Sequence, residues 1–507
     1  MNNAAAIVRS VITYALCVPL AIFLGYQLSD PLTQSAFFGV GLLALLLTFP
    51  ILLRWHHLLL LMSWNLAAVL FFVPGRPNVW LVMTLISLTI SVLQRALNKE
   101  MRFVNVPQVT WPLVCLTLVI LVTAKLTGGI GIRAFGSDVY GGRRYAYLLA
   151  AILGYFALSA HRIPPQRAGL YVGVFFLGAI TAAIGDLFTL ANPSLYFIFW
   201  LFPPSKVTGD MVLGTTRLGG ISSLAMPGLC YLLARYGFRG TFDVRRPWRL
   251  VWFFLFLATG FLGGFRSMII LIAMTLAIQF YLEGLHRTKM FPALILGLIL
   301  VGAMAVPVAS KLPYTFQRAL AFLPLQVDPM VRQEAEASSE WRKLMWVAVL
   351  PEVPKHLMLG KGYALSIFDF DLWGNVDSGG NAENWGSTIS GDYHNGPLSV
   401  ILTFGIWGAL AFLWFTAAAL RVLYANYRYC DPNLRTYNAI LLAVFASRLM
   451  LFLGVFGSLH GDMFFFASLL GVSVSLNGGV CRRASQRVPE PDKTTDLQAV
   501  VPRPVFQ

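Results

Sequence analysis

The chain has 507 residues, of which 57% are hydrophobic and only 12% are charged. Charged residues make up about a quarter of a soluble domain, so most of this chain cannot face water. The formal net charge of +16 does not indicate nucleic-acid binding, because the basic residues recur in small clusters between apolar runs, as they do beside membrane helices. The composition predicts an all-α polytopic integral membrane protein.

Apolar runs long enough to cross a bilayer follow one another along the chain, and we expect about 12–14 transmembrane helices of about 20 residues each. The predicted spans lie near 11–28, 35–53, 57–73, 79–93, 109–126, 145–160, 168–184, 218–234, 249–265, 267–283, 290–309, 396–420, 437–456 and 462–477. No small-residue cleavage pattern follows the first run, which is therefore predicted to be a retained helix. The five cysteines lie outside the long polar segment and do not indicate a disulfide framework.

Lys and Arg concentrate in alternate loops, and all these loops fall on one side of the membrane if both termini are cytoplasmic. The polar segment over 310–394 then lies outside, where its seven basic and ten acidic residues give a net charge of −3. Within it, SSEWRKLMWVAVL predicts a short amphipathic helix. The same topology places Arg143 and Arg144 outside, where the sequence does not separate a substrate contact from a lipid-headgroup contact.

These patterns divide the chain into five predicted regions. They are N-terminal transmembrane helices over 1–209, transmembrane helices with external arginines over 210–309, the large external loop over 310–394, C-terminal transmembrane helices over 395–477, and a cytoplasmic, basic, disordered tail over 478–507. An external loop of this length is more often functional than idle.

Polar side chains at the external helix ends are the candidate site. Arg217 opens one predicted span, Arg266 lies between two others, and His394 opens the span after the external loop. His460 and Asp462 lie at the turn between the last two spans. Converging arginines suit a phosphate or pyrophosphate, and a neutral imidazole supplies a proton acceptor near pH 7.

Each of these residues also has a structural alternative. Arg217 and Arg266 could be helix-end anchors at the membrane interface. His394 could be a turn residue before Asn-Gly-Pro, and Asp462 could cap a helix.

The segment HNGPLSVILTFGIWG resembles the signature of a known family. His394-Asn395, nine residues, Gly405, two residues and Gly408 resemble the signature of the O-antigen ligase and polymerase superfamily. Three further segments resemble family segments in the expected order over roughly 210–477. They are TTRLGGISSLAMPG with Arg217, GGFRSMIILIAM with Arg266, and an external-loop segment with Arg342, Trp346, Pro354, Gly360 and Gly362.

The resemblance implies a GT-C-like glycosyltransferase of the bacterial inner membrane whose catalytic face is periplasmic. The implied donor is a glycan on undecaprenyl pyrophosphate, transfer inverts the anomeric centre, and no cofactor or metal is implied. On this basis His394, Arg217 and Arg266 are predicted catalytic residues. The predicted substrate-binding residues are Arg342, Trp346, Asn395, Asp462 and Asp392, with either aspartate as an orienter of the histidine ring. Aromatic rings that could stack on sugars are Trp341, Trp346, Trp373 and Trp385.

Several functions stay open at this point. The acceptor could be lipid A-core or another hydroxyl (an O-antigen ligase), a second lipid-linked glycan (an O-antigen or exopolysaccharide polymerase), or a protein (an O-oligosaccharyltransferase). A polysaccharide transporter or flippase is the non-enzymatic alternative, although transporters usually carry charges near the bilayer midplane and paired repeats. Expected partners are the lipid-linked donor, the acceptor and membrane lipids, without nucleic acid.

Overall fold

The computed structural model describes residues 34–98, 103–132, 136–191, 193–205, 211–212, 215–365 and 392–483, with a few positions between 18 and 29. Within these residues most of the chain is helical. The strands among them are one short antiparallel pair, β1 (Met211–Val212) and β2 (Thr215–Thr216). In the same residues, seven helices are long and apolar enough to cross a membrane. The predicted all-α polytopic membrane protein is confirmed.

Long helices build the molecule, and shorter ones lie between them. The long helices are α2 (Gln34–Trp64), α3 (Val79–Leu97), α4 (Pro107–Thr127), α5 (Gly142–Ser159), α6 (Ala168–Leu177), α7 (Ala182–Ala191), α9 (Ala225–Thr241), α10 (Pro247–Thr259), α11 (Arg266–Leu282), α12 (Met290–Val308), α14 (Pro329–Val349), α18 (Gly396–Tyr429), α19 (Arg435–Gly454) and α20 (Leu459–Asn477). The shorter ones that concern the site are α8 (Gly219–Ser222), α13 (Tyr314–Leu320) and α15 (Val353–His356).

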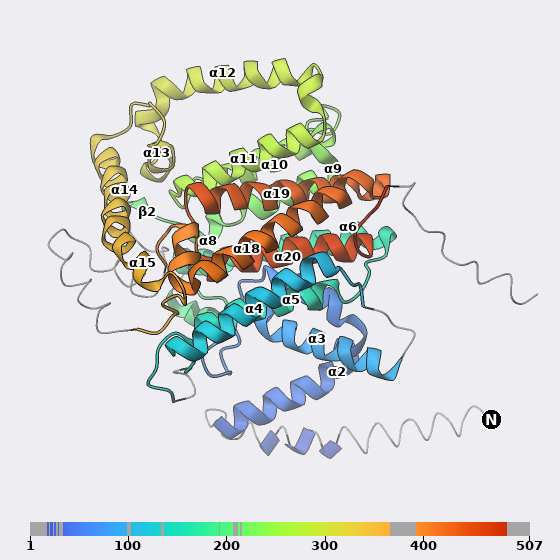
Figure 1. Ribbon diagram of the computed structural model, residues 1–507. Helices are drawn as coiled ribbons and strands as arrows, with labels where there is room; N and C mark the ends of the chain where they lie inside the picture. Colours follow the sequence, from blue (N-terminus) through green and yellow to red (C-terminus); the bar gives the residue numbers. More distant parts are fainter. Residues whose placement is uncertain are drawn as a thin grey trace, which may run out of the picture.

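The three C-terminal helices form the centre of the bundle (Figure 1). α20 packs against α5, α18 against α4, and α19 against α11. Phe415, Phe445 and Phe466 are fully buried among them. By contrast, α12 lies apart from the bundle and none of its residues is buried, so its apolar surface is left for lipid.

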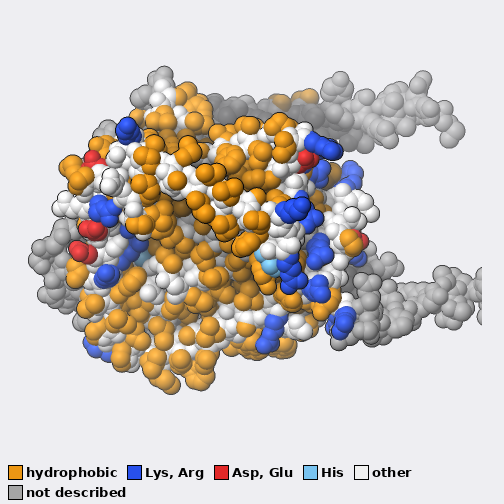
Figure 2. Space-filling view, turned by 90° about the horizontal axis from the view of Figure 1, so that it is seen from above, with side chains coloured by type: hydrophobic (Ala, Val, Ile, Leu, Met, Phe, Trp, Pro, Cys, Tyr) orange, Lys and Arg blue, Asp and Glu red, His pale blue; other side chains and the backbone are white. Residues whose placement is uncertain are grey.

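The helices run back and forth between two ends of the molecule (Figure 1). One end, here called the site end, holds the starts of α5, α11, α18 and α20, together with α13, α14 and α15. Backbone N–H groups tie it together: Tyr363 donates to the Tyr145 hydroxyl (2.9 Å) and Leu459 donates to the Ser399 hydroxyl (3.1 Å). Figure 2 shows Lys and Arg gathered at one end, mixed acidic and basic side chains at the other, and a mostly hydrophobic face between.

The predicted spans near 35–53 and 57–73 do not form two helices. A single helix, α2, runs through the first and ends inside the second, with Pro50 in its interior. After it, the Asn65 side chain donates to the carbonyl of Phe175 (2.7 Å), and the chain turns through Gly75 at a φ of 79°. Phe71 and Phe72 lie exposed in this turn, and these two apolar residues extend the hydrophobic run past the end of the helix. Hydrophobic length alone therefore does not fix a helix.

The amphipathic helix predicted from SSEWRKLMWVAVL is present as α14, and it begins earlier than predicted. Pro329 occupies its first turn, and Asp328 caps it by accepting a hydrogen bond from the backbone N–H of Met330 (2.8 Å). The extra turns carry α14 across the site end, toward the start of α11.

A break in α18 explains the first glycine of the signature. Gly405 has a φ of 65° and a ψ of −165°, which is not helical. The segment that follows α15 fills the break: the backbone N–H of Ile406 donates to the carbonyl of Leu357 (2.7 Å), and that of Gly362 donates to the carbonyl of Thr403 (2.9 Å). The segment after α15 and α18 are thus joined through backbone hydrogen bonds.

Candidate active site

His394 is held rigidly at the mouth of α18. Its φ is 49°, a conformation that costs a non-glycine residue about 1–3 kcal/mol and persists only where the surroundings fix it. The ring stacks on Phe456 (centroids 5.0 Å apart) and meets Trp341 edge-on (5.6 Å). Its Nδ1 atom is buried and has no hydrogen-bond partner among the described residues. The side chain is 21% exposed, so a substrate can still reach the ring.

Asp392 is the carboxylate beside this ring. Its Oδ1 lies 3.9 Å from His394 Nδ1, which is too long for a hydrogen bond, and 3.5 Å from the backbone nitrogen of His394. Burial lowers the pKa of the His394 imidazole, Asp392 raises it, and Arg342 lowers it. The net lowering keeps the imidazole neutral at pH 7, which is the form that accepts a proton.

Asn395 and Trp346 fix the backbone on either side of His394. Asn395 caps α18, since its side-chain oxygen accepts a hydrogen bond from the N–H of Leu398 (3.0 Å). The indole N–H of Trp346 donates to the carbonyl of Tyr393 (2.8 Å). Both side chains therefore have a positioning role, and their contact with a substrate stays a prediction.

Three arginines from three helices act on one another, and one of them, Arg342, also acts on His394; we call them the arginine cluster: Arg266 of α11, Arg318 of α13 and Arg342 of α14. Burial lowers the pKa of the Arg342 guanidinium, and the charges of Arg266 and Arg318 lower it further. The Arg342 guanidinium lies 5.7 Å from the ring of Phe456, the same ring on which His394 stacks.

The arginine cluster carries more positive than negative charge. Arg318 forms an ion pair with Glu334 (3.0 Å), whereas Arg266 donates to the neutral hydroxyl of Ser339 (3.1 Å). Among the described residues, neither Arg266 nor Arg342 is in an ion pair with a carboxylate. Guanidinium groups placed in this way suit a phosphate or pyrophosphate.

Arg217 lies beside the start of α11. Its Nε donates to the carbonyl of Gly263 (3.1 Å), and its guanidinium lies 4.9 Å from the ring of Phe265, the residue before Arg266. The residue is only 9% exposed. The structure therefore brings Arg217 and Arg266 to one helix start, although they are far apart in the sequence.

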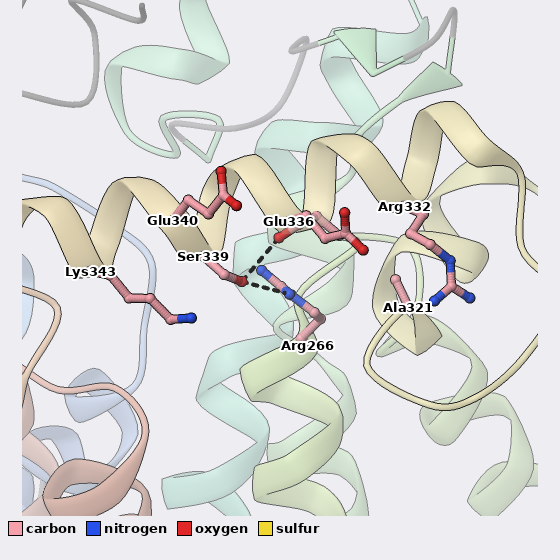
Figure 3. A pocket seen from close by; sticks show the side chains of 8 residues that line it. Arg266, Ala321, Arg332, Glu336, Ser339, Glu340 and Lys343 are labelled. Atoms are coloured by element: carbon pink, nitrogen blue, oxygen red, sulfur yellow. Dashed lines mark hydrogen bonds between the residues drawn. The ribbon is translucent and has the colours of Figure 1, made fainter. Parts of the chain in front are cut away.

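A pocket of about 170 Å³ opens beside Arg266, between α11 and the α13–α14 pair (Figure 3). The residues that line it are Arg266, Ala321, Arg332, Ala335, Glu336, Ser339, Glu340 and Lys343. Carboxylates and cations share its α14 wall, so it offers both hydrogen-bond acceptors and donors, as a polyhydroxylated ligand requires.

Asp462 lies with Arg448 and not against the histidine ring. Its Oδ1 accepts a hydrogen bond from Arg448 Nε (2.9 Å), and its Oδ2 accepts one from the backbone N–H of Ser458 at the start of α20 (2.8 Å). Of the two predicted orienters, Asp392 is therefore the one with its carboxylate beside His394. Sequence reasoning missed Arg448, although a cation inside an apolar run is itself a signal.

Other contacts had no signal in the sequence. Phe456 follows a membrane helix and Arg318 lies in the long polar segment, and only the fold brings the first to His394 and the second to Arg342. Trp373 and Trp385 lie outside the described residues. In the part of the chain that is described, no group of three or more His, Cys, Asp or Glu side chains is placed to hold a metal ion.

Comparison with known proteins adds a family to this geometry. Residues 251–413 match the O-antigen ligase family. The matched segment holds Arg266, Arg342 and His394, but it begins after Arg217 and ends before Asp462. A comparison with curated proteins finds no match. The segment over 251–413 thus matches an O-antigen ligase domain, and this match supports the O-antigen ligase and polymerase superfamily for the chain.

Proposed function

We propose that this protein transfers a glycan from undecaprenyl pyrophosphate to an acceptor hydroxyl at the external face of the inner membrane, as an O-antigen ligase does. The observation that carries the proposal is the setting of His394. A half-buried, neutral imidazole, fixed by its backbone and by two aromatic rings, lies beside a carboxylate and beside Arg342 of the arginine cluster.

The leaving group determines what the arginines do. The acceptor oxygen forms a bond to C1 of the donor sugar from the face opposite the pyrophosphate, while the C1–O bond to the pyrophosphate breaks and its electron pair leaves with that oxygen. Arg266, Arg342 and Arg217 would hold the pyrophosphate, since fixed positive charge is most useful where negative charge develops in the transition state. The pocket beside Arg266 would then take the first sugars of the donor.

The acceptor hydroxyl must lose its proton as the new bond forms. His394 would take that proton on Nε2, because Nδ1 is buried and faces Asp392. The resulting imidazolium would draw in the Asp392 carboxylate, and the present 3.9 Å separation would close to a hydrogen bond. Asp392 is thus a positioning residue.

The test is transfer from a purified lipid-linked oligosaccharide, read as a gel shift of the acceptor with chelator present. His394→Ala should insert normally, still bind the donor, and lose roughly 10²–10⁴-fold in rate. His394→Gln separates proton transfer from orientation, since Gln hydrogen bonds but takes no proton at neutral pH. His356→Ala, at a partly exposed histidine of α15, is the matched control and should transfer normally. If His394→Ala transfers at the parent rate, the histidine is only a turn residue.

The same assay identifies the acceptor. Lipid A-core, a second lipid-linked repeat and an acceptor protein are offered separately to the parent protein. We expect transfer to lipid A-core; transfer only to one of the other two would make the protein a polymerase or a protein glycosyltransferase.

A further inference from the structure

Arg143 and Arg144 open α5 at the site end, and their surroundings differ. Arg143 is exposed, and its guanidinium lies 5.4 Å from the ring of Tyr147. Arg144 turns inward, so that its guanidinium lies 5.6 Å from the ring of Tyr363. Its Nη1 atom is buried and has no hydrogen-bond partner among the described residues. No carboxylate in that part of the chain forms an ion pair with Arg144.

Aromatic groups lie beside this guanidinium. Burial raises the pKa of the Tyr363 and Tyr393 phenols, and the positive charge of Arg144 acts against that rise in both. The ring of His460 meets Tyr363 edge-on at 6.1 Å. Tyr393 directly precedes His394, and the charge of Asp392, the carboxylate beside His394, also acts on the Tyr363 phenol.

Arg144 comes from a different side of α18 than Arg266 and Arg318 do. It comes from α5, below α18 in Figure 1, whereas α11 and α13 of the arginine cluster lie above α18 in that view. In an inverting transfer the nucleophile and the leaving group occupy opposite faces of C1. A cation across the base from the pyrophosphate site is therefore on the acceptor's side.

We propose that Arg144, lying against Tyr363, binds a phosphate or carboxylate group carried by the acceptor. The inference rests on the proposed function, which supplies the donor side of the site. A buried guanidinium nitrogen without a partner loses its hydrogen bond to water, and a bound oxyanion restores it with a charge-assisted bond. A lipid headgroup has the same phosphate chemistry, but the exposed Arg143 is the arginine placed for it.

The test uses inorganic phosphate as the probe and needs no transfer reaction. Phosphate binding is measured by calorimetry on the full-length protein in nanodiscs of net-neutral phosphatidylcholine. The background is the double variant Arg266→Gln/Arg342→Gln, which removes two of the three arginines proposed to hold the donor's pyrophosphate. Adding Arg144→Gln should weaken the remaining phosphate binding roughly tenfold or more, and adding the matched Arg143→Gln should not. Arg144→Lys should stay folded and bind phosphate several-fold more weakly than arginine does, and it decides the test if the Gln variant unfolds.

Three results would overturn the inference. The first is equal phosphate binding by the Arg144→Gln and Arg143→Gln proteins. The second is a background variant that binds no phosphate at all. The third is that phosphatidylglycerol added to the nanodiscs competes with phosphate for the background variant but not for the variant that also carries Arg144→Gln. That result would assign the Arg144 site to lipid headgroups. The proposed function fails separately, when the background variant still transfers glycan at the parent rate.

Discussion

At the scale of single residues, two opposite charges tune the candidate base. Burial is the largest effect and lowers the pKa of His394, while Asp392 raises that pKa and Arg342 lowers it. A general base works only when neutral, so transfer should fall as the pH drops through the folded-state pKa of His394, which lies below its ordinary value of about 6.5.

This balance predicts opposite shifts in two variants. Asp392→Asn removes the charge that raises the pKa, so the acid limb of the kcat/KM profile should move to lower pH. Arg342→Gln removes a charge that lowers it, so the limb should move to higher pH. His356→Ala removes another external imidazole and should leave the limb in place. If neither charge variant moves the limb, His394 is not the group that titrates.

Replacing Arg217 or Arg266 by lysine should reduce glycan transfer even though the positive charge is kept. Lysine keeps the charge but loses the planar fork, so Arg217→Lys and Arg266→Lys should each reduce transfer, by roughly tenfold or more, with normal insertion. Arg217→Lys also loses the Nε bond to the carbonyl of Gly263. The exposed Arg143→Lys is the control, measured in the same gel-shift assay. Parent-level transfer by the double lysine variant would make both residues interfacial anchors.

At the scale of elements, the break in α18 requires a glycine at position 405, because the backbone there adopts a conformation that other residues avoid. An alanine at position 405 would have to adopt a φ of 65° and a ψ of −165°, and its Cβ would lie 2.7 Å from the carbonyl oxygen of Leu357. Strain of this kind costs about 1–3 kcal/mol, before the clash is counted.

Gly405→Ala should therefore lower the unfolding temperature in detergent and the yield of folded protein, and it should disturb the segment after α15. Gly454→Ala is the control, because a Cβ there meets nothing within 4 Å and the residue ends a helix. The comparison is made by thermal unfolding of the purified proteins. Equal stability of the two variants would contradict a role for the glycine in joining the loop to α18.

The same elements show what the sequence can predict. The helix α14 follows from its amphipathic period, and the two ends of different charge follow from hydropathy and charge. The interruption of α18 does not, because its apolar run is continuous and the bonds that replace the helical ones come from a distant segment. Arg143 and Arg144 could not be separated either: neighbours on a helix point about 100° apart, and only the packing of Tyr363 shows which one faces inward.

At the scale of the whole molecule, two ends of different charge enclose an apolar middle (Figure 2). Arg217, Arg266 and His394 lie at the site end, whereas Arg246, at the start of α10, lies at the other end. Hydropathy and charge in the sequence predicted this division, because the positive-inside pattern is a property of loops and not of packing. The contacts within the site end depend on packing and were beyond the sequence.

The division predicts a topology with a direct consequence for the chemistry. A reporter fused after Gly380, which lies in the external loop outside the described residues, should read as external, and reporters fused after Arg246 or Arg483 should read as cytoplasmic. Paired alkaline phosphatase and fluorescent-protein fusions give opposite signals at each position, so a fusion that is merely unstable is recognised. In the proposed function, the donor's pyrophosphate reaches the arginine cluster from the external leaflet. A cytoplasmic signal at position 380 would put the arginine cluster and His394 on the wrong side of the membrane and end the proposed transfer, whatever their geometry.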